Sequence, residues 1–271
     1  IVFGSAVIDN VITELQEIES GFYRYDFNID VVKENSSAKV FIRGLGIGTD
    51  EDYVETEKVT SLIKLQESED AQWSSISSNL RRKINKAQIN EIVVKVGSIE
   101  LLDDFYSVYS ENIVQLGSLN YSKSFFNDLL LCDNTRSSNI FVAYKNGIPV
   151  GGGLLAHYCG FYENVFFATL KDYQKDYVSD IMHWEMIKFS IVDNAKAERK
   201  NKSTSVYSFG RSTLNSGAYK YKNHWPVENH HLFNYSNISD LKKSGWLLNI
   251  WRNLPSFITN PLGAKLIVHI Y

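Results

Sequence analysis

Short apolar runs alternate with polar stretches over the first 65 residues of the chain. Residues 5–9 predict a strand, and Asp9 or Asn10 can cap a helix that follows it. The apolar positions of this predicted helix recur at helical spacing and are Val11, Ile12, Leu15 and Ile18. Residues 39–43 and 60–65 predict two further strands on either side of a polar, acidic loop.

Residues 73–90 have a different pattern, which predicts a basic amphipathic helix. The apolar positions of this helix are Leu80, Ile84 and Ala87. Its basic positions are Arg81, Arg82, Lys83 and Lys86. Residues 92–96 then predict a strand, and two helices are expected at residues 99–116 and 122–131.

The strongest hairpin signal in the chain comes next. Residues 139–144 and 148–158 predict two strands, and the turn at residues 145–147 contains Asn-Gly, a pair that tolerates positive φ at both turn positions. A third strand is expected at residues 165–170, followed by a polar stretch at residues 171–180.

A second apolar stripe predicts a helix after this polar stretch, with members Ile181, Trp184, Ile187, Ile191 and Val192. Strands are then expected at residues 206–209 and 231–235. From residue 92 onward the predicted order is therefore one strand, two helices, a hairpin, a strand, a helix and a strand.

Composition is that of a folded protein. The chain has 271 residues, of which 44% are hydrophobic, so it is long enough for one large domain or two small ones. A formal net charge of -3 argues against a broad surface for duplex DNA, although a local basic stripe can still hold a nucleic-acid strand or a phosphate.

Cysteine and histidine usage predicts neither a disulfide framework nor a metal site. Cys132 and Cys159 lie in segments that are expected to be helix and strand interior, so we interpret both as core thiols. The six histidines lack the two-histidine spacing of a zinc site. The first residues lack a secretory signal and no apolar run reaches about 18 residues, so we expect a cytoplasmic protein.

One run of residues resembles a known family. Tyr207-Ser-Phe-Gly-Arg-Ser-Thr-Leu-Asn-Ser-Gly-Ala-Tyr-Lys-Tyr-Lys-Asn-His-Trp225 is similar to the Phe-Gly-Arg-Ser, Gly-x-Tyr and Phe-Lys-x-x-Trp run of FemAB-like proteins of the GNAT acyltransferase superfamily. Further stretches that are similar to this family, in the same order, lie at residues 80–87, 116–126, 183–185 and 251–255. The resemblance therefore extends from about residue 71 to the end of the sequence.

The resemblance implies an α/β fold of the GNAT type, in which helices flank a mixed, mostly antiparallel central sheet. FemAB-like proteins usually contain two GNAT-like halves, and the first half is expected to be incomplete here. We therefore expect a partial first half at residues 1–72, a basic connecting helix at 73–90, a second GNAT-like domain at 91–238 and a helical tail at 239–271.

The resemblance also implies a reaction, the transfer of an acyl or aminoacyl group to an amine or hydroxyl of a cell-envelope or exopolysaccharide precursor. The expected partners are then a glycan or peptidoglycan-type precursor and, if the donor is aminoacyl-tRNA, a tRNA. Two alternatives stay open. One is an acetyl-CoA-dependent N-acetyltransferase that acts on an amino sugar, and the other is a GNAT-like scaffold that binds a glycan or partner without catalysis.

The sequence departs from coenzyme A-dependent GNAT proteins in one place. Those proteins usually carry glycines ahead of the helix that follows the hairpin-side strands, because backbone amides there bind the pyrophosphate. Residues 171–180 contain no glycine, and the triple glycine at residues 151–153 lies on another strand, where relief of crowding is its expected role. This departure argues against coenzyme A, and the donor stays open between aminoacyl-tRNA and acyl-CoA.

Lys222 is the first candidate for catalysis. It matches the lysine of the Phe-Lys pair in FemAB-like transferases, with Tyr221 in place of phenylalanine. A fixed cation stabilises the negative charge that develops on the acyl oxygen. The alternative is a solvated lysine on a helix surface.

Arg211 directly follows the predicted strand at residues 206–209 and is the second candidate. Its guanidinium can bind a carboxylate or phosphate through two parallel hydrogen bonds, or it can form a structural salt bridge with Glu185. Glu185 is itself a candidate general base. It belongs to the segment His183-Trp184-Glu185, near a helix N-terminus where a phosphate or carboxylate can bind.

Further candidates for substrate binding surround these residues. Gly210 allows a close approach of the backbone, and Ser212 is either a binding residue or, with Asn215, a cap for the helix expected near Ser216. The aromatic rings of Tyr219 and Trp225 can line an acceptor site or pack in the core.

Arg81 and Lys86 are the cations of the basic helix that we expect to bind a pyrophosphate, an acidic glycan or tRNA, because they need not share its apolar face. The same cations can simply form a solvated helix face. Trp184 is a further candidate for substrate binding. The tail at residues 245–271 combines tryptophans with cations, which is consistent with a peripheral membrane contact, with packing on the domain or with a homodimer.

Overall fold

The computed structural model describes residues 12–17, 23–27, 41–44, 54–116, 118, 120–131, 137–158, 160–196 and 205–236. Eight strands of these residues form one sheet. They are β3 (Phe41–Gly44), β4 (Val54–Lys64), β5 (Ile92–Gly97), β6 (Ser137–Lys145), β7 (Ile148–Tyr158), β8 (Phe161–Thr169), β9 (Val206–Thr213) and β10 (Glu228–Ser236).

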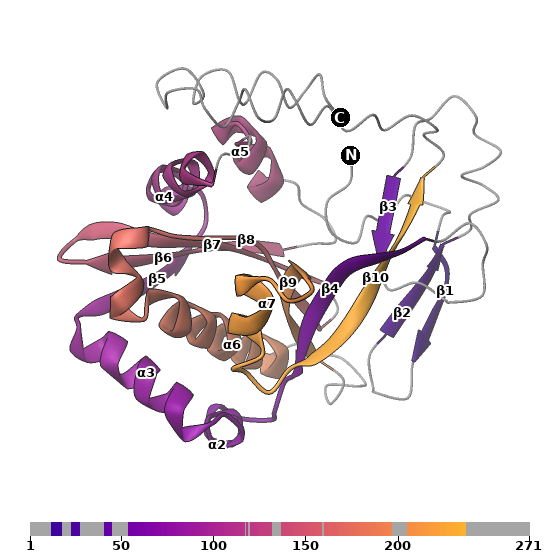
Figure 1. The fold of residues 1–271 in the computed structure, drawn as a ribbon, viewed down its shortest axis with the longest axis horizontal. Helices are drawn as coiled ribbons and strands as arrows, with labels where there is room; N and C mark the ends of the chain where they lie inside the picture. Colours follow the sequence, from indigo (N-terminus) through magenta and orange to yellow (C-terminus); the bar gives the residue numbers. More distant parts are fainter. Residues whose placement is uncertain are drawn as a thin grey trace.

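The strand order in this sheet is β3-β10-β4-β9-β8-β7-β6-β5 (Figure 1). The strands β8 and β9 are parallel, and the other neighbouring pairs are antiparallel. The fold is therefore the mixed, mostly antiparallel α/β fold that the sequence predicts.

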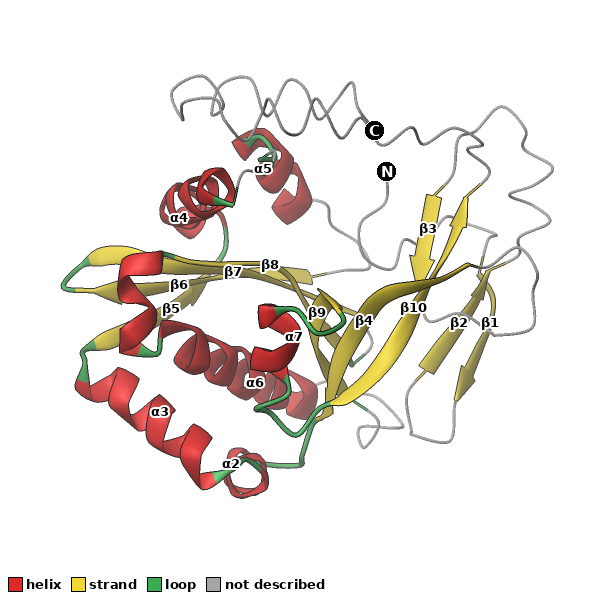
Figure 2. Ribbon diagram, viewed as in Figure 1, coloured by secondary structure: helices red, strands yellow, loops and turns green. Residues whose placement is uncertain are grey.

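Helices cover both faces of the sheet (Figure 2). The helices α4 (Leu102–Gln115) and α5 (Lys123–Leu131) pack on one face, after the short helix η1 (Ile99–Leu101). The helices α3 (Ser78–Ile89) and α6 (Val178–Lys196) pack together on the other face, with α2 (Glu69–Ser75) before them. The turn helix η2 (Lys171–Asp176) precedes α6, and the short helix α7 (Gly217–Lys222) contacts β9.

The hairpin of β6 and β7 confirms the prediction from Asn-Gly. Asn146 and Gly147 have φ values of 52° and 77°, as a tight turn between twisted strands requires. The glycines that follow let helices approach β7 on both faces. A Cβ on Gly151 would lie 2.5 Å from the Met182 sulfur of α6, and one on Gly152 would lie 3.0 Å from the Phe105 ring of α4.

The helix predicted around residues 11–18 is wrong. Residues Ile12–Glu17 form strand β1, which pairs antiparallel with β2 (Tyr23–Phe27). The apolar spacing fits a helix, but a nearby segment rich in tyrosine and phenylalanine offers a partner strand, and pairing decides the structure of such short segments. The strand predicted at residues 5–9, both cysteines and the tail at residues 239–271 lie outside the described residues.

The single basic helix predicted at residues 73–90 is two helices, α2 and α3. Ile76 and Ser77 are extended between them, because the side chain of Ser77 accepts the Leu80 N–H at 3.3 Å and so begins a new helix. The predicted apolar face is confirmed, since Leu80, Ile84 and Ala87 are buried against α6 and the sheet.

The strand β4 lies between β9 and β10, although both follow it much later in the sequence. The hydrogen-bonded residues Thr60 of β4 and Ser208 of β9, for example, are 148 residues apart. The sheet thus runs without a break from β3 and β4 into the later strands, and the division of the chain into domains stays a prediction. In the part of the chain that the structure describes, no helix is long and apolar enough to cross a membrane.

Candidate functional site

The parallel strands β8 and β9 part after a short stretch of pairing. They pair only from Phe161 with Val206 to Glu163 with Ser208. Two residues later Gly210 has a φ of 68°, and its N–H donates to the Ser208 hydroxyl at 3.1 Å. A Cβ on Gly210 would lie 2.6 Å from the Asn164 carbonyl oxygen, so the backbone here requires glycine.

The side chain of Lys222 is buried where these strands part. Lys222 is the last residue of α7, a helix that begins at the cap Ser216. Its side chain is folded against β9, and the residue is only 7% exposed. The ammonium donates to the Gly210 carbonyl at 2.7 Å and to the Arg211 carbonyl at 3.1 Å. The alternative of a solvated helix lysine is therefore wrong.

The surroundings of Lys222 change the pKa of its ammonium group. Burial lowers the pKa of the Lys222 ammonium to about 8, Glu163 opposes this fall and Arg211 adds to it. Among the described residues the two carbonyls are its hydrogen-bond partners, and an ammonium has three N–H groups. One N–H group of Lys222 thus has no hydrogen-bond partner in the part of the chain that the structure describes.

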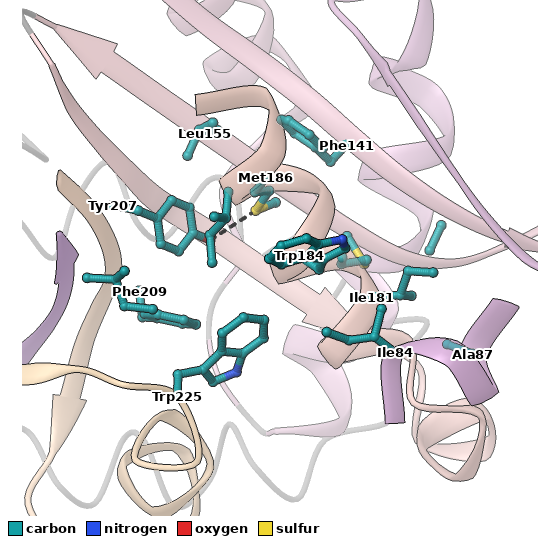
Figure 3. Close-up of a cluster of buried hydrophobic side chains, with 14 of the residues drawn as sticks. Ile84, Ala87, Phe141, Leu155, Ile181, Trp184, Met186, Tyr207, Phe209 and Trp225 are labelled. Carbon is teal, nitrogen blue, oxygen red and sulfur yellow. Dashed lines mark hydrogen bonds between the residues drawn. The ribbon is translucent and has the colours of Figure 1, made fainter. Parts of the chain in front are cut away.

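His183 of α6 lies beside Lys222. It is 2% exposed, and its Nδ1 atom lies 2.8 Å from the Tyr207 hydroxyl, which donates to the sulfur of Met186 at 3.3 Å (Figure 3). The tautomer of His183 decides which of the two atoms, Nδ1 of His183 or the Tyr207 hydroxyl, donates in this pair. Burial, with a smaller contribution from Lys222, holds the pKa of His183 well below its usual range, so the imidazole is neutral.

Three buried polar atoms near His183 have no hydrogen-bond partner among the described residues. They are Oδ1 of Asp180, the hydroxyl of Tyr221 and Nε1 of Trp225. Asp180 is 5% exposed and lies in the first turn of α6, one turn before His183 and on the same helix face. Trp225 is 3% exposed, and its ring centroid lies 5.4 Å from that of Phe209 (Figure 3).

These three groups are close enough to influence one another. Burial raises the pKa of Asp180 to about 6, and Lys83 opposes this rise. Burial also raises the pKa of the Tyr221 phenol, and the charge of Asp180 adds to the effect. The indole N–H of Trp225 lies toward the Tyr221 hydroxyl and opposes the rise in the Tyr221 pKa. The two atoms do not reach hydrogen-bond geometry, so neither has a hydrogen-bond partner among the described residues.

The result is one contiguous group, which we call the buried polar cluster. Its members are Asp180, His183, Tyr207, Tyr221, Lys222 and Trp225. The first two turns of α6, the strand β9 and the helix α7 with its following turn supply these side chains. The cluster combines a cation, a carboxylate and unpartnered hydrogen-bonding groups, which is the equipment needed for polar catalysis.

Three solved structures have a similar fold. FemX matches with a TM-score of 0.55 and 13% identity, over 84% of this chain and 72% of FemX. The C-terminal domain of a protein from Agrobacterium fabrum, assigned as a lysylphosphatidylglycerol synthetase, matches with a TM-score of 0.50 and 12% identity, over 75% of this chain and 70% of that domain. The chain therefore shares its fold with FemX and with this domain.

A conserved protein of unknown function from Bacteroides thetaiotaomicron has a similar fold too, with a TM-score of 0.52 and 10% identity, over 77% of this chain and 72% of that protein. No family model and no curated protein sequence matches the chain. At these identities the likeness to solved structures extends to the fold alone.

The candidates Arg211 and Glu185 do not form the predicted ion pair with each other. Arg211 is exposed and does not end a strand, because β9 continues to Thr213 and pairs Arg211 with Thr60 of β4. Glu185 forms its ion pair with Lys188 at 2.9 Å, not with Arg211. The predicted salt bridge between Arg211 and Glu185 is therefore wrong, and Glu185 lies outside the buried polar cluster.

Three further candidates lie in the region where α6 faces α2 and α3: Trp184 belongs to α6, and Arg81 and Lys86 belong to α3. The ring of Trp184 packs on Trp73 of α2 with 4.8 Å between ring centroids. The guanidinium of Arg81 donates to the Trp73 carbonyl at 3.1 Å, which holds α3 to α2. The ammonium of Lys86 lies 6.0 Å from the ring of Tyr177. Their roles in substrate binding stay predictions.

The residues before α7 differ from the prediction. Neither Ser212 nor Asn215 caps this helix, because the Ser216 hydroxyl accepts the Tyr219 N–H at 3.2 Å. Asn215 instead turns the chain, with a φ of 61°. The hydroxyl of Ser212 is buried and has no hydrogen-bond partner among the described residues, and Tyr219 is half-buried.

The sequence did not point to Asp180, His183 or Tyr207 as members of the cluster. One signal was present, since Asp180 and His183 are three residues apart on a helix face that is otherwise apolar. A carboxylate and a histidine at such positions indicate a buried polar site, because charged groups rarely face a core without a reason.

Proposed function

We propose that the protein is an acyltransferase, which transfers an acyl or aminoacyl group to an amine or hydroxyl of a cell-envelope or exopolysaccharide precursor. The observation that carries the proposal is the buried ammonium of Lys222, held by the Gly210 and Arg211 carbonyls where β9 parts from β8. The fold, which FemX and the lysylphosphatidylglycerol synthetase domain share, supports an acceptor from the cell envelope.

Lys222 would act on the acyl carbonyl. When a nucleophile attacks this carbon, negative charge develops on the carbonyl oxygen, and a cation in a site with little water stabilises that charge strongly. The two backbone carbonyls fix the ammonium in advance, so no rearrangement is needed as the charge develops. With a pKa of about 8, Lys222 carries its charge at neutral pH.

An aminoacyl donor is supported over an acyl-CoA donor by the start of α6. A helix N-terminus binds a pyrophosphate through free backbone N–H groups. Here the first turn of α6 carries the carboxylate of Asp180, which repels a phosphate, and the preceding residues 171–180 contain no glycine. We therefore favour aminoacyl-tRNA and keep acyl-CoA as a second arm of the test.

The test is a transfer assay with the purified protein. Aminoacyl-tRNAs and acyl-CoAs are offered as donors, and nucleotide-linked and lipid-linked glycan precursors as acceptors, with product detected by mass spectrometry. The variant Lys222→Gln keeps a donor for the two carbonyls but loses the charge. We expect its kcat to fall by about 100-fold or more, as when an oxyanion donor is removed.

The matched control is Lys220→Gln, because Lys220 lies on the same helix and is exposed. Thermal unfolding monitored by circular dichroism checks that both variants are folded. Unchanged turnover by Lys222→Gln contradicts the proposed role of Lys222. Transfer from acetyl-CoA to an amino sugar, with tight coenzyme A binding by calorimetry, favours the N-acetyltransferase, and no product from any pair favours the scaffold.

A further inference from the structure

The unpartnered atoms of the buried polar cluster have a composition that a ligand can complete. Asp180 offers a carboxylate oxygen as acceptor, Tyr221 offers a hydroxyl that both accepts and donates, and Trp225 offers an N–H donor. Native proteins leave few buried polar atoms without a partner, so three such atoms in one place call for an explanation.

Two independent features coincide here. The first is the N-terminus of the 19-residue helix α6, whose first turn holds Asp180. The second is the pair of unpartnered side chains Asp180 and Trp225, which are 5% and 3% exposed. A carboxylate is stabilised at a helix N-terminus, so Asp180 can remain ionised and accept a proton from a ligand in spite of its burial.

A primary amine fits these groups better than a hydroxyl. Its two N–H groups can donate to the Asp180 carboxylate and the Tyr221 hydroxyl, and its lone pair accepts the Trp225 N–H until the amine attacks the acyl carbon. A hydroxyl has one hydrogen and can satisfy only one of these acceptors.

We propose that Asp180, Tyr221 and Trp225 form the subsite for a primary amine of the acyl acceptor, and that Asp180 accepts the proton of this amine during transfer. The proposal rests on the acyltransferase function proposed above and adds a base to it. The helix α7 carries Tyr221, and the turn that follows this helix carries Trp225.

Transfer consists of the addition of the amine followed by the loss of the leaving group. The lone pair of the amine forms the new bond to the acyl carbon, and the carbonyl oxygen becomes negative beside Lys222. The nitrogen proton moves to Asp180. When the carbonyl re-forms, the bond from carbon to the leaving group breaks, and the leaving group takes the proton from Asp180, which returns to its carboxylate form.

The pH dependence follows from the groups that face Asp180. Lys83 approaches it from α3 and Tyr221 from α7, His183 shares its helix face, and Tyr207 of β9 lies next to Tyr221. The pKa of Asp180 is about 6 and that of Lys222 about 8, so we expect kcat/KM to fall below pH 6 and above pH 8.

The kinetic experiment uses Asp180→Asn, which keeps the shape of the side chain and removes the base. We expect kcat to fall by about 100-fold or more and the acid limb of the pH profile to disappear, with the KM of the donor unchanged. The control is Asp172→Asn, an exposed position of η2 that should keep the rate and both limbs. An unchanged kcat and acid limb in Asp180→Asn overturn the role of Asp180 as a base.

A binding experiment tests whether the subsite binds an amine, independently of catalysis. The protein has five tryptophans, and the Nε1–H signal of Trp225 in a ¹⁵N spectrum is assigned with Trp225→Phe. Ethanolamine, as a primary amine, should move this signal in the wild type but not in Asp180→Asn. Ethylene glycol, which has hydroxyls alone, should have a much smaller effect.

The outcomes separate the two proposals. No response to ethanolamine in the wild type overturns the amine subsite and leaves a site for water only, and an equal response to ethylene glycol overturns the choice of an amine. If the signal responds as expected but no donor and acceptor pair gives product, the amine subsite stands, and the transfer reaction falls together with the role of Asp180 as its base.

Discussion

On the face of the sheet covered by α4 and α5, buried tyrosines find hydrogen-bond partners. The Tyr109 hydroxyl accepts the N–H of Tyr121 at 3.3 Å, and the Tyr106 hydroxyl donates to the Tyr121 carbonyl at 3.1 Å. These rings pack edge to face in one cluster around Phe126. This face uses its polar atoms to hold the segment between α4 and α5 in place.

On the face covered by α6 and α7, side chains of the same kind are left without partners. The hydroxyl of Tyr221, an oxygen of Asp180 and the indole nitrogen of Trp225 are buried and unpartnered among the described residues. An unsatisfied buried polar atom costs about 1–3 kcal/mol, so this face gives up stability that the other face retains. The difference indicates that the polar atoms near α7 are kept for a ligand, not for the fold.

The largest effect is expected from Gly210→Ala. An added Cβ would lie 2.6 Å from the Asn164 carbonyl, and the φ of 68° is unfavourable for alanine, so the free energy of unfolding should fall by about 3 kcal/mol or more. The counterpart on the other face is Gly152→Ala, whose Cβ would meet the Phe105 ring at 3.0 Å, and a loss of about 1 kcal/mol is expected there. Urea unfolding of both variants measures the difference, and an equal loss contradicts it.

A smaller effect of opposite sign is expected from Asp180→Asn. Burial raises the pKa of Asp180 from 3.8 to about 6, so the folded protein holds this proton more tightly than the unfolded chain does. Its contribution to stability therefore decreases as the pH rises from about 4 to 6. The variant removes the buried charge and should gain roughly 2 kcal/mol at pH 7, from about 1.4 kcal/mol for each unit of pKa shift and a discount for solvent relaxation.

The same variant should gain almost nothing near pH 4, where Asp180 is protonated in the folded protein. Urea unfolding at pH 4 and pH 7 measures this difference, with Asp172→Asn as the exposed control. A gain that is independent of pH contradicts the assignment of the cost to the carboxylate charge.

The smallest effects come from a matched pair of tyrosines. Tyr109→Phe leaves the Tyr121 N–H without its acceptor and should cost about 1–2 kcal/mol of stability. Tyr221→Phe removes an unpartnered hydroxyl and should leave stability unchanged or slightly raised, while it slows transfer. Thermal unfolding and the transfer assay together test the pair, and a comparable loss of stability in both variants removes the distinction between the two faces.

Local signals in the sequence predicted most of the described elements. The Asn146-Gly147 turn, the buried stripe of Leu80, Ile84 and Ala87 and the helix α6 follow from patterns within about 20 residues. The segment at residues 11–18 failed because its structure depends on pairing with Tyr23–Phe27, which no periodicity within the segment reveals.

The candidate site was predicted only in part, for a similar reason. Lys222 and Gly210 lie in the run that resembles FemAB-like proteins, and the structure brings them together through a hydrogen bond of 2.7 Å. Asp180 lies 41 residues earlier than Tyr221, and their proximity depends on how α6 and α7 pack on the sheet. The ion pair of Glu185 with Lys188 was likewise decided by a neighbour on the same helix.

The position of β4 has a consequence for how the protein folds. Its register with β9 pairs residues such as Thr60 and Arg211. The hydroxyls of Thr60 and Ser208, which are 148 residues apart in sequence, form a hydrogen bond between the same two strands. Contacts of such long range form slowly, because a large loop must close before any of them stabilises the chain. The strand that carries Gly210 thus gains its neighbour late, and we expect the surroundings of Lys222 to be among the last parts of the sheet to become ordered during folding.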